Sequence, residues 1–273
     1  MRRGSAAMST NHKPSPSAGT AADIPLRWLR LAGIAGIVGA ILWTLGDALI
    51  IGAKANTADY PLIFGRYADR VETDMAAMML PSSEARLAAG ALVADVGVVF
   101  YLAGSWHLFR GLLPAGRAWA WPVFVLLICG NAWSPLGHAG FYYVGMVYKT
   151  LLATPTEAHA VLLDLGKDFH DVLRIAWLLP IVTLGLALLG LGIAIALGRT
   201  AWPRWFALVA NPVSLVAIGI GIAFVSPEPV ATWLDGAAFN LGWLVVYLVS
   251  TTLLWNGATS RAAQPESPAT DPT

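Results

Sequence analysis

Six apolar segments, each about twenty residues long, constrain this chain more than any other feature. A helix of about twenty apolar residues crosses the roughly 30 Å of hydrocarbon in a bilayer, where a helix satisfies its own backbone hydrogen bonds. We therefore predict an all-α fold, a six-span transmembrane helix bundle. The predicted spans are residues 29–51, 87–108, 119–143, 172–197, 205–225 and 238–255.

Composition supports a membrane protein and argues against a nucleic-acid partner. Hydrophobic residues make up 57% of the chain and charged residues only 12%, whereas an ordinary soluble domain has about 25% charged residues. A nucleic-acid-binding protein would carry clustered basic residues, but the net charge here is only +1. The predicted partner is the lipid bilayer. The single cysteine, Cys129, is interpreted as a small buried core residue.

Charge in the connecting loops predicts the orientation. Arg110 and Arg117 lie between the second and third segments, and Arg199 and Arg204 lie between the fourth and fifth, with no acidic residue in either loop. The alternate loops carry the acidic residues. Because short cytoplasmic loops are enriched in Lys and Arg, the pattern predicts a multi-pass protein of the cell (inner) membrane, with both termini cytoplasmic.

Three regions are predicted along the chain. Residues 1–25 and 257–273 are rich in Ser, Ala, Pro and Thr and are expected to be disordered cytoplasmic tails, while residues 26–256 form the membrane domain. An Arg-Trp pattern recurs at the start of the first, third and fifth segments. Either three helical hairpins share this pattern, or tryptophans simply mark the membrane interface.

The third segment carries a polar face. Asn131, Ser134, His138 and Tyr142 are three or four residues apart and therefore lie on one side of a helix. Pro135 lies between them and frees a backbone carbonyl. The pattern predicts that this face meets other polar groups inside the bundle.

Other segments place polar residues at a similar depth. Asp47 and Asp95 lie in the first and second segments, and an ionised carboxylate facing lipid is costly. We expect both to face the interior, with Arg174 as their partner in an ion pair. The remaining candidates at this depth are His170, Asp171 and Asn240, whereas His107 and His159 are interpreted as incidental.

The hypothesis is one cavity reached from the outer face. Asp47, Asp95, His138 and His170 are candidates for acid, base or divalent-metal ligand, because carboxylates and imidazoles serve all three roles. Three functions remain open: binding or processing of a lipid or small amphiphile, a structural or partner-binding role in which the polar residues only stabilise the bundle, and a small transporter or transporter subunit. The candidate binding residues are Asn131, Ser134, Tyr142, Asp171, Arg174 and Asn240.

Two resemblances bear on these alternatives. Ser134 and His138 form an SxxxH arrangement that resembles part of the motif set of seven-span hydrolases related to alkaline ceramidases and adiponectin receptors, in which a serine, an aspartate and three histidines surround zinc. This chain departs from that set, because six spans are predicted and no HxxxH follows. The stretches at 30–47, 59–62 and 137–145 resemble uncharacterised bacterial multi-pass membrane proteins, which implies no particular activity.

Overall fold

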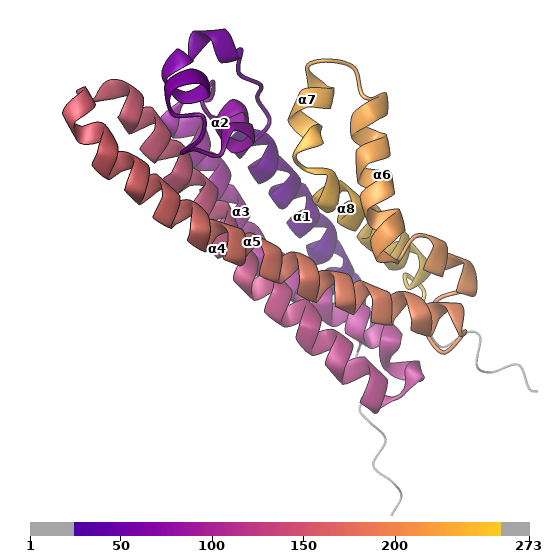
Figure 1. The fold of residues 1–273 in the computed structure, drawn as a ribbon. Helices are drawn as coiled ribbons and strands as arrows, with labels where there is room; N and C mark the ends of the chain where they lie inside the picture. Colours follow the sequence, from indigo (N-terminus) through magenta and orange to yellow (C-terminus); the bar gives the residue numbers. More distant parts are fainter. Residues whose placement is uncertain (1–24, 258–273) are drawn as a thin grey trace, which may run out of the picture.

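The computed structural model describes residues 25–257, and every regular element in that range is a helix (Figure 1). The predicted disordered tails lie outside the described residues, except for residues 25 and 257. The α-helices are α1 (Leu26–Ile50), α2 (Thr73–Met79), α3 (Glu84–Leu112), α4 (Arg117–Ala153), α5 (His159–Ala196), α6 (Pro212–Val225), α7 (Val230–Asp235) and α8 (Ala238–Leu253). Short helical turns are η1 (Thr57–Asp59), η2 (Leu62–Arg66), η3 (Leu113–Ala115), η4 (Thr156–Ala158) and η5 (Arg204–Leu208).

Four helices, α1, α3, α4 and α5, are long and apolar enough to cross a membrane. The shortest of them, α1, has 25 residues and extends about 38 Å at 1.5 Å per residue. The apolar helices α6 and α8 have 14 and 16 residues, or about 21 and 24 Å, which is less than a full hydrocarbon core. Length and composition therefore indicate a membrane protein with four helices of crossing length.

Local capping explains why α6 is shorter than its predicted segment, 205–225. The side-chain oxygen of Asn211 accepts a hydrogen bond from the backbone nitrogen of Ser214 at 3.0 Å, and Pro212 occupies the first turn. Asparagine before proline is a strong start signal for a helix. The apolar residues before Asn211 form η5 instead.

Two other helices extend well beyond their apolar segments. The third segment was predicted to end at residue 143, but α4 continues to Ala153. The fourth was predicted to begin at residue 172, but α5 begins at His159. Apolar patterning marks only the part of a helix that is suited to lipid, whereas a helix ends where its backbone bonding ends.

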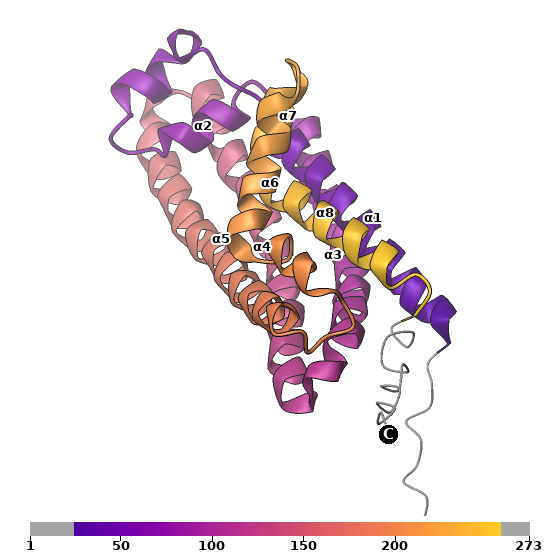
Figure 2. The same cartoon turned by 90° about the vertical axis from the view of Figure 1, so that its right-hand side faces the viewer.

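Three pairs of helices pack side by side, α1 with α3, α4 with α5 and α6 with α8 (Figures 1 and 2). Contacts of α3 with α4 and of α1 with α8 join these pairs. Arg30 Nε donates to the carbonyl of Trp255 at 2.7 Å, so the two ends of the described chain meet. We call this end of the bundle the terminal end and the opposite end the capped end.

Residues 53–83 cover the capped end. Tyr67 OH lies 3.0 Å from Nδ1 of His159, and Lys149 Nζ donates to the carbonyl of Leu80 at 2.8 Å. These bonds tie the segment to α4 and α5, and Met79 from α2 is fully buried against them. The segment therefore caps the bundle.

Arg86 of α3 holds the capped end of α1. Its guanidinium donates to the carbonyls of Ala48, Leu49 and Gly52 at 2.8 to 3.1 Å. The last carbonyls of a helix have no partner within the helix, and an arginine here satisfies them. This contact fixes the end of α1 immediately beside Asp47.

Candidate functional site

Four helices contribute side chains to one bonded cluster, which we call the polar network. Asn240 of α8 donates from Nδ2 to Oδ2 of Asp47 in α1 at 2.6 Å. The amide oxygen of Asn240 accepts from the hydroxyl of Tyr101 in α3 at 3.1 Å. His138 of α4 completes the network, with Nε2 3.3 Å from Oδ1 of Asp47.

Each member of the network has a defined role. Nδ1 of His138 lies 3.0 Å from the carbonyl of Ser134, and a carbonyl only accepts, so Nδ1 carries a hydrogen. Nε2 therefore faces the Asp47 carboxylate and donates to it when the ring is protonated. The Asp47 side chain is only 16% exposed, and Asn240 and His138 supply the partners that a largely buried carboxylate requires.

Trp43 sets the register that brings α1 and α3 together. Its indole nitrogen donates to the carbonyl of Ala94 at 2.7 Å. Its ring packs 4.3 Å from that of Tyr101 and 5.1 Å from that of His138, measured between centroids. Gly97 allows this close fit, because a Cβ there would collide with the indole. One large side chain thus aligns three helices around the network.

The predicted polar face on α4 points inward for most of its length. Asn131 is 2% exposed and donates to the hydroxyl of Ser105 at 3.0 Å, closer to the terminal end than the network. Ser134 is buried and donates to the carbonyl of Gly130. Tyr142 instead packs with the apolar core at the capped end and is not among the residues that line the cavity described below.

The candidates on α5 lie apart from the network. His170 Nδ1 is 3.7 Å from a carboxylate oxygen of Glu72, and Asp171 pairs with Lys167. Arg174 is exposed and, within residues 25–257, has no carboxylate within ion-pair distance. The predicted ion pair of Arg174 with Asp47 or Asp95 is therefore wrong. The reason is that Arg174 lies on an exposed face of α5, outside the hydrogen bonds of the network.

Asp95 lies near the network but outside its hydrogen bonds. It is partly buried on α3, and one carboxylate oxygen has no hydrogen-bond partner among the described residues. It does not line the cavity beside Asp47. Asp95 thus faces the bundle without joining the other candidates.

A cavity of about 650 Å³ opens beside the network. Helices α1, α4, α5, α6 and α8 form its walls. Most of the lining is apolar, whereas Asp47, Ser134, His138 and Asn240 form a polar patch on it. The aromatic lining residues are Trp43, Phe141, Trp177, Phe239 and Trp243.

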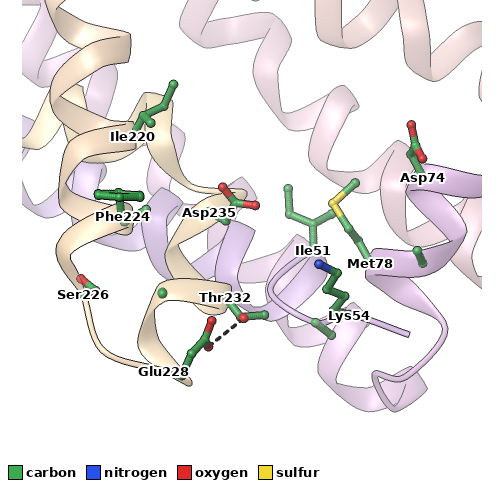
Figure 3. Close-up of a pocket in the computed structure, with 14 residues that line it drawn as sticks. Ile51, Lys54, Asp74, Met78, Ile220, Phe224, Ser226, Glu228, Thr232 and Asp235 are labelled. Carbon is green, nitrogen blue, oxygen red and sulfur yellow. Dashed lines mark hydrogen bonds between the residues drawn. The ribbon is translucent and has the colours of Figure 1, made fainter. Parts of the chain in front are cut away.

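A second hollow of about 720 Å³, the outer hollow, adjoins the cavity at the capped end (Figure 3). Ile51, Asp74, Met78, Ile220 and Asp235 line both spaces. The capping segment 53–83, which includes α2, forms one side of the outer hollow, and α6 and α7 form the other. The shared residues therefore mark the mouth of the cavity.

The candidate metal ligands are not assembled as one set. Within the described part of the chain, no group of three or more His, Cys, Asp and Glu side chains could hold a metal ion. Among the candidates, Asp47 and His138 are in contact, while His170 pairs with Glu72.

Comparison with known proteins places the chain in a family. A model of a family of unknown function (DUF6796) matches residues 23–256. The chain belongs to this family. No curated protein and no solved structure matches it significantly. The family match agrees with the resemblance to uncharacterised membrane proteins and covers every residue of the polar network.

Nothing in these comparisons supports a likeness of this DUF6796 chain to ceramidase-type hydrolases. Ser134 and His138 interact through a backbone carbonyl, not through their side chains. In this family member the contact between Ser134 and His138 is a local one within α4, because residues four apart lie on one face of a helix.

Sequence reasoning missed several residues that organise this DUF6796 fold. Tyr101 and Trp43 were not candidates, since aromatic residues in apolar segments give no signal of a polar contact. His107 and His159 were interpreted as incidental, but both are buried. His107 contacts the carbonyl of Leu29 and the hydroxyl of Ser250 at 3.0 and 2.9 Å. These histidines connect elements far apart in the sequence.

Proposed function

We propose that this membrane protein binds a small amphiphile in the cavity beside the polar network. The observation that carries the proposal is a largely apolar cavity of about 650 Å³ in which Asp47, Ser134, His138 and Asn240 form one polar patch. Ligand sites in proteins have this combination, with volumes of about 300 to 1,000 Å³. The apolar walls would hold the hydrocarbon part, and the polar groups of the lining, at the patch and at the mouth, would orient its polar group.

The proposal includes six membrane crossings in a bacterial cell membrane, with both termini in the cytoplasm. The arginine-bearing loops, 113–116 and 197–211 with their flanking residues, lie toward the terminal end, and the acidic loops lie toward the capped end (Figure 1). The positive-inside rule then assigns the terminal end to the cytoplasm. Helices α6 and α8 would complete their crossings with the help of η5 and α7. The cavity would open on the outer side.

Cysteine labelling tests this topology. In a Cys129→Ala background, an impermeant maleimide added to intact cells is expected to label Ala68→Cys and Glu228→Cys but not Ala118→Cys or Thr200→Cys. Labelling after cell lysis is the control for reactivity. Labelling of Ala118→Cys in intact cells would show that the orientation is the reverse of the proposed one. Equal labelling at positions 200 and 228 would show that α6 does not cross the membrane.

Filling the cavity tests the binding function. Gly185 lines the cavity, and a Cβ at this position would meet no heavy atom within 4 Å. We expect Gly185→Leu to reduce the amphiphile that co-purifies in mild detergent at least severalfold, as measured by mass spectrometry. Thermal stability should not fall, because leucine has a helix propensity about 1 kcal/mol better than glycine.

Gly221→Leu provides the matched control. Gly221 on α6 also has open space around its Cβ position, but it does not line the cavity. Its replacement should leave the co-purified amphiphile unchanged. An unchanged amphiphile content in Gly185→Leu as well would contradict binding in this cavity.

The structural alternative is supported by the bonds within the network. Asp47, Asn240, His138 and Tyr101 satisfy one another without any ligand. If the residues only stabilise the bundle, the filled cavity of Gly185→Leu should have no effect on bound amphiphile. The same variant thus separates the two functions.

A further inference from the structure

The charges around the cavity and the outer hollow are predominantly negative. Within residues 25–257, five carboxylate residues line one or both spaces, whereas the basic side chains there are one lysine, Lys54, and one histidine, His138. The carboxylates are Asp47, Glu72, Asp74, Glu228 and Asp235. Lys54 lines only the outer hollow. A phosphate headgroup would find no arginine or lysine along the cavity itself.

Two of these carboxylates flank the mouth. Asp74 comes from α2 and Asp235 from α7, on opposite sides of the outer hollow (Figure 3). Both are exposed, and neither has a basic nitrogen within 4 Å among the described residues. Because they line both spaces, a ligand entering the cavity from the outer hollow passes near them.

The cavity wall behind the mouth is rich in aromatic rings. Three tryptophans, Trp43, Trp177 and Trp243, line it. The face of an aromatic ring carries negative electrostatic potential and attracts cations, most strongly for tryptophan. Carboxylates at the mouth and indole rings inside therefore favour the same sign of charge on a ligand.

Resting on the proposed function, we propose that the ligand of this cavity is a lipophilic cation, an apolar compound that carries an amine, quaternary ammonium or comparable positive group. The apolar body occupies the cavity beside the indole rings. The positive charge is attracted by Asp74 and Asp235 at the mouth. Anionic amphiphiles of the same size are disfavoured.

A pair of probes matched in size tests the sign of the charge. Tetraphenylphosphonium and tetraphenylborate have nearly the same shape and opposite charge. Equilibrium dialysis against the full-length protein in maltoside micelles, with empty micelles subtracted, is expected to show the phosphonium binding at least about tenfold more tightly. Added salt should weaken this preference, because the mouth carboxylates are exposed.

Charge-removing variants test whether the mouth carboxylates cause the preference for the phosphonium. The double variant Asp74→Asn/Asp235→Asn is expected to weaken phosphonium binding about five- to tenfold, which is the scale for two exposed ion pairs. The control is Asp69→Asn/Glu157→Gln, which removes the same charge from exposed sites at the capped end that line neither space. The control should change binding less than about twofold. Thermal stability of each variant shows that it is folded.

The outcomes distinguish this inference from the proposed function. Equal binding of the two probes, or equal effects of the two double variants, would overturn the cation preference. If Gly185→Leu still lost its co-purified amphiphile, the binding function would stand without that preference. Phosphonium binding that depends on Asp74 and Asp235 but is unaffected by Gly185→Leu would place the cation outside the cavity and also overturn the inference.

Discussion

Gly219→Ala is expected to destabilise the protein strongly, by about 3 kcal/mol or more, because overpacking alone typically costs 1 to 3 kcal/mol. A Cβ at Gly219 of α6 would overlap the backbone carbonyl of Ala238 at the start of α8. A backbone carbonyl cannot move aside as a flexible side chain can. The two helices would have to separate.

That separation would also disturb the cavity. Leu215, Val216 and Ile220 of α6 line the cavity, and α8 carries Asn240 of the polar network. Moving α6 away from α8 shifts one wall relative to the polar patch. We therefore expect Gly219→Ala to lose bound amphiphile together with stability, unlike Gly185→Leu.

Thermal unfolding in detergent, followed by tryptophan fluorescence, measures the effect. Gly221→Ala is the control, two residues along the same helix, where a Cβ would meet no atom within 4 Å. It should be neutral or stabilising by up to about 1 kcal/mol, because alanine favours helix more than glycine does. Similar stability of the two variants would show that α6 and α8 do not approach so closely.

Asn240→Ala is expected to destabilise the protein by about 3 kcal/mol, because a partly buried carboxylate and a buried hydroxyl each lose a partner. Asp47 loses the donor at 2.6 Å, and the hydroxyl of Tyr101 loses its acceptor. Alanine cannot replace either bond. A partly satisfied buried network is less stable than a complete one.

Removing the hydroxyl of Tyr101 is expected to cause a smaller loss of stability. Tyr101→Phe deletes only the bond to Asn240 and should cost about 1 kcal/mol. Tyr143→Phe is the control, since Tyr143 is 49% exposed and its hydroxyl makes no hydrogen bond within the described residues. If Asn240→Ala unfolds at the wild-type temperature and the two Tyr→Phe variants are alike, the network does not stabilise the fold.

Periodicity and transfer cost predicted the parts of this protein that depend on local sequence. Long apolar segments predicted an all-helical membrane protein, because a helix alone satisfies its backbone in lipid. The spacing of Asn131, Ser134 and His138 predicted one polar side of α4, and in the structure Asn131 and Ser134 are buried within the bundle. Asp47 was expected to face inward for the same energetic reason, and it contacts His138 and Asn240.

Helix ends were less predictable. Hydropathy placed the start of the fourth segment at residue 172, whereas α5 begins at His159. In this longer helix His170 lies beside Glu72, and Arg174 has no carboxylate partner among the described residues. The pattern of apolar residues does not show how far a helix continues beyond its lipid-facing part.

The sequence by itself thus determined the helical class, the main apolar segments and the inward face of α4, because these depend on residues within a few turns of one another. The tertiary structure alone decided the partners of Asp47 and the existence of the cavity. Tyr101 and Asn240 meet across 139 residues of chain, and Asn240 bonds to Asp47 across 193 residues. Such contacts arise from the packing of whole helices, which no local pattern of residues encodes.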